Sequence, residues 1–168
     1  MVYYIGQALG VVSAVCSLIL PMLKKKSQML VMTMFTNGLV ALNLVMIGEF
    51  GSAVLIHSLA VVQAVVSLRH IRHETPVTKR ENLLFLVLYV ACGLLGYKRP
   101  IDVLPIVGSL FNMAATFQKD VHKTRVLILI NVSTFVVYYI LVRSTSVLMV
   151  SCTIVTTLIA MIRDRKRR

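Results

Sequence analysis

The sequence has few charged residues: Asp, Glu, Lys and Arg make up 14% of its 168 residues, and only 6 residues are acidic. A water-soluble domain of this length needs a far more charged surface. Its three cysteines, Cys16, Cys92 and Cys152, all fall within apolar stretches. An odd number of buried thiols does not make a disulfide framework. These shortages exclude an ordinary soluble domain and a disulfide-stabilised secreted one.

Apolar residues are abundant instead, at 58% of the chain, and they form seven charge-free runs. A helix needs roughly 17 to 25 mostly apolar residues to cross a ~30 Å hydrocarbon layer. Five runs reach this length, and two shorter ones rely on flanking basic side chains that extend to the interface. The sequence therefore predicts an all-α membrane protein with seven transmembrane helices, or six if one short run re-enters. The runs are 1–23, 27–48, 50–68, 82–97, 103–118, 126–142 and 144–162.

The basic residues gather on alternate connections between these runs. Only Lys98, Arg99 and Arg143 of the 18 lysines and arginines fall on the other connections. This bias predicts an N-terminus outside and a C-terminus in the cytoplasm. We therefore assign the net charge of +12 to topology and to anionic lipid head groups, and we expect no nucleic acid as a partner. The start of the chain has no basic segment of the kind that precedes a signal peptide, so we expect the first run to be retained.

The run at 82–97 lies between two groups of three runs. A unit of three spans begins and ends on opposite sides of a membrane, so one extra span makes two such units parallel. The sequence thus predicts a 3+1+3 design: a three-helix repeat at 1–73, a cytoplasmic loop plus linker helix at 74–99, and a second three-helix repeat at 100–168. Parallel repeats of this kind are a known transporter plan. The linker run itself contains nothing that suggests a ligand site.

Polar side chains inside the apolar runs carry the functional signal. A buried amide is costly unless it is paired, so it should face the bundle interior or a wet cavity. Hydrogen bonding between helices is the alternative to ligand contact, and for a lone histidine the structural role is favoured. Pro21 is a candidate hinge or an ordinary kink. The candidate pocket residues between the two repeats are Asn37, Asn43, His57, Gln63, Asn112 and Asn131.

Other features have simpler interpretations. Gly6 and Gly10 are four residues apart in the first run, and such small residues let a neighbouring helix approach closely. Tyr138 and Tyr139 are expected at the outer interface, where aromatic belts form. The segment HIRHE at 70–74 matches no metal motif, so we interpret the basic stretch 69–80 that contains it as a solvated loop.

The sequence favours a permease for a small polar solute over an enzyme. No nucleophile–base–acid set, paired carboxylates or metal cluster can be assembled from its residues, so we expect neither catalysis nor a cofactor. Glu49 and Asp102 lie at the edges of runs, which argues against proton coupling through a buried acid. The alternative is a non-transporting membrane protein that serves in assembly, in sensing or as a partner subunit. Whether the chain forms a homo-oligomer is left open.

The segment DVLPIVG at 102–108 resembles the YgjV-type family of bacterial inner-membrane proteins. The resemblance extends over the whole chain, through the glycines of the first run, Ile47-Gly48 and Leu68-Arg69. It implies a bacterial inner membrane location and a distant similarity to the SWEET and PQ-loop transporters, which have the 3+1+3 design. Leu20-Pro21 resembles their Pro-Gln corner, but Met22 replaces the glutamine. No tryptophan is present to stack on a sugar, and the family implies no substrate.

Overall fold

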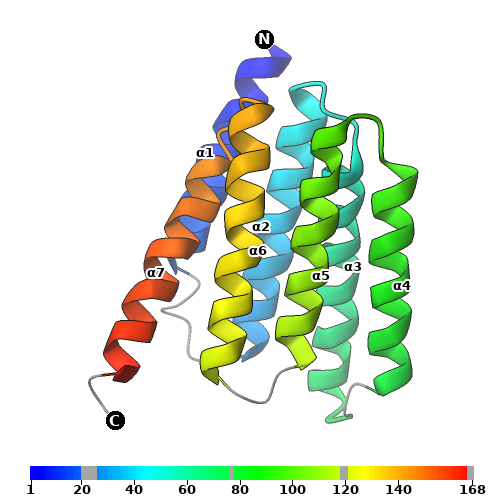
Figure 1. The fold of residues 1–168 in the computed structure, drawn as a ribbon, viewed down its shortest axis with the longest axis vertical. Helices are drawn as coiled ribbons and strands as arrows, with labels where there is room; N and C mark the ends of the chain where they lie inside the picture. The colour runs from blue at the N-terminus through cyan, green and yellow to red at the C-terminus, as the bar shows by residue number, and fades with distance from the viewer. Residues whose placement is uncertain (20–25, 76–77, 118–120, 166–168) are drawn as a thin grey trace.

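The computed structural model describes residues 1–19, 26–75, 78–117 and 121–165. These residues form seven α-helices, one 3₁₀ helix (η2) and no strand, which confirms the predicted all-α class. Successive helices run in opposite directions along one bundle (Figure 1). Each α-helix overlaps one of the predicted apolar runs. The elements are α1 (Val2–Ile19), α2 (Lys26–Met46), α3 (Ser52–Arg72), α4 (Lys79–Leu95), η2 (Pro100–Asp102), α5 (Val103–Phe117), α6 (Val121–Leu141) and α7 (Val147–Arg165).

Helix length separates the elements into two groups. Within the described residues, α1 and α3 are long and apolar enough to cross a membrane by length and composition. Four further helices have shorter apolar segments, and the number of spans therefore stays a prediction. These segments are Leu30–Met46, Pro100–Ala114, Arg125–Leu141 and Val147–Ile159.

Six of the helices form a closed ring. Going round it, α1 contacts α2, α2 contacts α3, α3 contacts α5, α5 contacts α6, α6 contacts α7, and α7 returns to α1. Helix α4 lies outside this ring, against α3 and α5 (Figure 1). Because α4 connects the two groups from the outside, its side chains can reach the interior only between α3 and α5.

The glycines of α1 close the ring. A Cβ atom on Gly6 would lie 2.8 Å from the Met46 Cβ of α2, and one on Gly10 would lie 2.9 Å from the Ser146 nitrogen just before α7. A larger side chain at either position would therefore fit only if the backbone moved. These two residues therefore let α1 pack between α2 and α7 at close range.

The two tyrosines near the end of α6 are fully buried. Tyr138 and Tyr139 belong to the central apolar cluster, together with Leu44, Ile56 and Phe135. The prediction that the tyrosines form an interfacial belt is therefore wrong. The position of a residue in an apolar run indicates how far along the helix it lies, but it does not indicate which face of the helix the residue is on. In α6 that face points into the ring.

The basic stretch after the third run is also more ordered than predicted. Helix α3 continues to Arg72, so residues 69–72 are helical and not part of a solvated loop. His73 caps the helix, and its backbone nitrogen donates to the Arg69 carbonyl at 3.0 Å. The extra turn carries the side chain of His70 to the start of α4.

Candidate functional site

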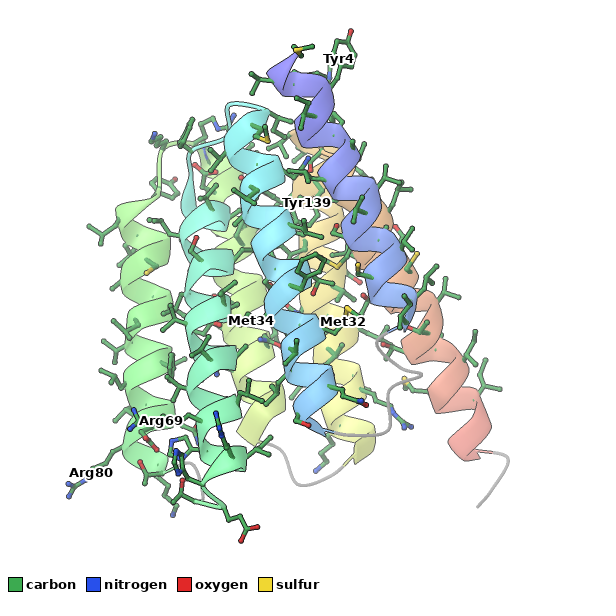
Figure 2. The ribbon with its side chains drawn as sticks, turned by 180° about the vertical axis from the view of Figure 1, so that it is seen from behind. Tyr4, Met32, Met34, Arg69, Arg80 and Tyr139 are labelled. Carbon is green, nitrogen blue, oxygen red and sulfur yellow. The ribbon has the colours of Figure 1, made fainter. Side chains whose placement is uncertain are left out.

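A cavity of about 690 Å³ lies inside the ring. Its wall is made by α2, α3, α5, α6 and α7, with α4 contributing Tyr89 and Asn82. It begins near His57 and Phe135 in the middle of the bundle and reaches His70 and Asn82 at the end where α3 stops. Figure 2 shows Arg69 and Arg80 at that end, and Tyr139 inside the bundle. The cavity is therefore placed off-centre, toward the more basic end.

The structure brings five of the six predicted pocket residues to this one cavity. The residues that line it are Asn37, His57, Gln63, Asn112 and Asn131. Asn43 is not part of the lining. Pro21, the predicted hinge, lies outside the described residues.

His57 is held at the inner end of the cavity by two hydrogen bonds. Its Nδ1 lies 2.7 Å from the Asn37 Oδ1, and its Nε2 contacts the Tyr139 hydroxyl. The Asn37 amide nitrogen donates to the Thr33 carbonyl at 2.8 Å, which leaves the Asn37 oxygen to accept from the imidazole. This pattern assigns the ring proton to Nδ1, with Nε2 accepting from Tyr139. A neutral, fully paired histidine thus joins α2, α3 and α6.

Gln63 makes a second polar link across the cavity. Its Oε1 accepts from the Tyr89 hydroxyl at 2.7 Å, and its Nε2 points at the Met113 sulfur, 3.8 Å away. Tyr89 comes from α4 and is 2% exposed. The linker helix therefore contributes to the site, contrary to the prediction from its sequence.

Asn131 differs from the other amides of the cavity. Its Oδ1 is buried and has no hydrogen-bond partner in the described residues. Buried amide oxygens are usually paired, so this oxygen would gain a hydrogen bond if the side chain turned it toward a donor in the cavity. Ser109, by contrast, donates to the Ile106 carbonyl within its own helix, at 2.7 Å.

Asn43 fastens the opposite end of the bundle. Its Nδ2 donates to the Gly6 carbonyl of α1 at 2.7 Å. Its Oδ1 accepts from the Ser146 hydroxyl at 2.9 Å and also from the Ser144 hydroxyl. The residue is fully buried. One amide therefore ties α2 to α1 and to the turn between α6 and α7, which is a packing role.

A charged cluster closes the same end beside α4 and α5. The Arg99 guanidinium pairs with Glu49, and one of these hydrogen bonds measures 3.2 Å. This bonding, chiefly the hydrogen bond to Glu49, raises the pKa of Arg99. The buried carboxylate of Asp102 accepts from the backbone nitrogens of Lys98 and Arg99 at 3.0 and 2.9 Å. The turn between α2 and α3 is thereby joined to the turn between α4 and α5.

The mouth of the cavity has a smaller polar cluster. The His70 Nε2 lies 2.9 Å from a Glu81 oxygen, and its Nδ1 lies 2.8 Å from the Thr75 hydroxyl. Thr78 and Glu81 form a capping box at the start of α4. The backbone and hydroxyl hydrogen bonds from Thr78, and then His70, lower the pKa of Glu81. Sequence reasoning missed His70, although a histidine two residues after the end of an apolar run was the available signal.

The lining of the cavity is polar but carries no fixed charge. None of its described residues is Asp, Glu, Lys or Arg. No group of His, Cys, Asp and Glu in the described part of the chain could hold a metal ion. The site can therefore offer hydrogen bonds from amide, hydroxyl and imidazole groups.

Residues 4–168 match the model of the Imp-YgjV family, described as bacterial inner membrane protein, and the chain belongs to this family. No curated protein matches the chain. No solved structure matches it either.

Proposed function

We propose that this member of the bacterial inner membrane protein family is a permease for a small polar solute. One observation carries the proposal: polar side chains from both halves of the chain line one cavity, with His57 and Gln63 from α3 facing Asn112 and Asn131 from α5 and α6. A volume of about 690 Å³ falls within the ~300–1,000 Å³ typical of small-molecule sites.

The order of the helices supports a 3+1+3 design. In the ring α1, α2 and α3 follow one another, and α5, α6 and α7 then follow in the same order. Helix α4 packs outside the ring, as a linker would do, and adds Tyr89 and Asn82 to the cavity wall. The cavity lies where the two groups meet, which is where transporters built from repeats bind their solutes.

The charge pattern suggests which side the cavity serves. The end that it reaches carries Arg69 and Arg80 (Figure 2) and, close by, Arg72 and Lys79. Cytoplasmic connections are the ones enriched in lysine and arginine. We therefore propose that the cavity opens to the cytoplasm, with the chain crossing the inner membrane several times and the Asn43 and Arg99 clusters sealing the outer end.

Transport in this scheme needs the outer clusters to separate as one repeat rocks against the other. Glu49 belongs to the first repeat and Arg99 and Asp102 precede the helices of the second, so the ion pair crosses the interface that must open. No carboxylate lines the described cavity wall, so facilitated diffusion fits better than proton coupling.

The test is solute uptake into proteoliposomes that contain the purified protein, with a panel of small radiolabelled solutes. We expect at least one solute to enter about ten times faster than into protein-free vesicles. His57→Ala and Asn112→Ala should slow that uptake, because both side chains line the cavity. Gln28→Ala is the matched control, since Gln28 is an exposed polar residue of α2 outside the cavity. If His57→Ala and Asn112→Ala took up the solute as fast as Gln28→Ala, the proposal would be contradicted.

The alternative function, a membrane protein that does not transport, is favoured by a specific observation. Asn37 and Tyr139 each hydrogen-bond to His57, and Asn43 hydrogen-bonds to Ser146, so these side chains hold helices together. Side chains with this structural role need no solute to explain their presence. If no solute of the panel crosses the membrane and none raises the melting temperature of the protein, the alternative is correct.

A further inference from the structure

We infer that the solute of this cavity is uncharged and donates a hydrogen bond to the Oδ1 of Asn131. This inference rests on the proposed function and specifies the class of solute. It follows from the charges around the cavity, from the hydrogen bonds already made inside it, and from the course of the helices through it.

Of the charged residues near the cavity, Arg99 and Glu81 are already paired with other groups, and the arginines at its mouth are not part of its described lining. Arg99 pairs with Glu49 beyond the inner end, where Asp102 is held by backbone nitrogens. Glu81, at the mouth, is bonded to Thr78 and His70. Because no Asp, Glu, Lys or Arg lies in the described lining, an ion that left water for this cavity would find no countercharge.

Helix dipoles do not supply the missing charge either. Membrane transporters often bind charged groups at the ends of half-helices near the midplane. Here α3 and α6 pass unbroken through His57 and Asn131, so their peptide groups are paired within the helix at that depth. The described wall thus favours a solute without net or separated charges.

The hydrogen bonds already made inside the cavity then single out Asn131. Asn37 and His57 use their donors and acceptors on each other, on Thr33 and on Tyr139. The Gln63 oxygen is taken by Tyr89. The Asn131 Oδ1 remains as a buried acceptor without a partner in the described residues. A hydroxyl or amide N–H of the solute would satisfy this oxygen, and an acceptor-only group would not.

The experiment compares uncharged and charged probes in the same proteoliposomes. Glycerol, urea and erythritol are the uncharged donors, and choline, lactate and glycine carry a positive, a negative and a zwitterionic charge. We expect wild-type protein to admit at least one uncharged probe about tenfold faster than any charged one. Asn131→Leu should lower that uptake at least tenfold, with Gln28→Leu as the matched control outside the cavity.

Two further readouts separate a ligand contact from a structural role. Asn131→Leu should leave the melting temperature of the protein unchanged or raise it, because it removes an unpaired acceptor. Asn131→Asp places a carboxylate in the cavity and should increase choline uptake relative to wild type. A large drop in melting temperature for Asn131→Leu, or no change in selectivity for Asn131→Asp, would overturn the inference.

The outcomes also distinguish this inference from the proposed function. Equal uptake of charged and uncharged probes would overturn the inference and leave the permease standing. Where no probe is transported, thermal shift with the same probes decides: stabilisation by an uncharged probe that Asn131→Leu abolishes keeps the inference and overturns the permease. The absence of both uptake and stabilisation overturns both.

Discussion

The two ends of the bundle are built differently. At the end where α2 stops, hydrogen bonds join segments that are far apart in the sequence: Asn43 reaches Gly6 and Ser146, and Gln7 reaches Thr145. At the end where α3 stops, the described contacts are more local, such as that between His70 and Glu81, and the cavity extends to that end.

Two asparagines express this difference in one residue type. Asn43 and Asn131 both lie in apolar helices, and a sequence pattern treats them alike. The Asn43 amide finds three partners in its surroundings, whereas the Asn131 oxygen finds none in the described residues. The same amide group therefore links helices at one end and leaves a buried, unpaired acceptor in the described residues nearer the other.

The largest expected effect comes from filling the close approach at the fastened end. In Gly10→Leu the new side chain would meet Thr145 and the backbone of Ser146, so α1 must leave the ring. Overpacking typically destabilises by about 1–3 kcal/mol, and a clash with backbone exceeds that range. The melting temperature in detergent measures the loss.

Gly38→Ala is the matched control for this substitution. Apart from its own helix backbone and its adjacent residues, no atom of the described residues lies within 4 Å of where a Gly38 Cβ would be, so alanine should fit in α2 and stabilise it by about 0.5–1 kcal/mol. A Gly10→Leu variant that melts with the wild type would show that the α1 contact does not hold the ring.

A smaller effect is expected when the two asparagines are compared directly. Asn43→Ala leaves the Gly6 carbonyl and the Ser144 and Ser146 hydroxyls without this partner in a buried site, at a cost of about 1–3 kcal/mol. Asn131→Ala removes an oxygen that has no partner in the described residues, so its effect should be well under half as large. Melting temperatures of the two variants side by side check the difference, and equal losses would break the comparison.

The smallest effect concerns the start of α4. The pKa of Glu81 is lowered in the folded state, so its contribution to stability is present above its ordinary pKa. That contribution is lost as the pH falls through the lowered value. Glu81→Gln should therefore melt below wild type at neutral pH and approach it in acid. Glu74→Gln, at an exposed carboxylate, is the control and should show no such convergence.

The sequence predicted the helices well because charge-free runs must be satisfied by internal backbone hydrogen bonds. Five of the six residues that it proposed for a pocket line the cavity. It could not tell which face of a helix turns inward, so Tyr139 and Tyr89 were missed. Nor could it separate Asn43 from Asn131, because the difference lies in neighbours such as Ser146, 103 residues away.

The closure of the ring by α1 affects when this helix can complete its packing during synthesis. The Gln7 carbonyl accepts from the Thr145 hydroxyl at 2.6 Å, across a separation of 138 residues. At a synthesis rate of about 5–20 residues per second, α1 would wait roughly seven to thirty seconds for this partner to emerge. During that interval its glycine face has only α2 to cover it. The helix that completes the finished molecule is thus the one that spends longest incompletely assembled, and an insertase or chaperone would have most to protect there.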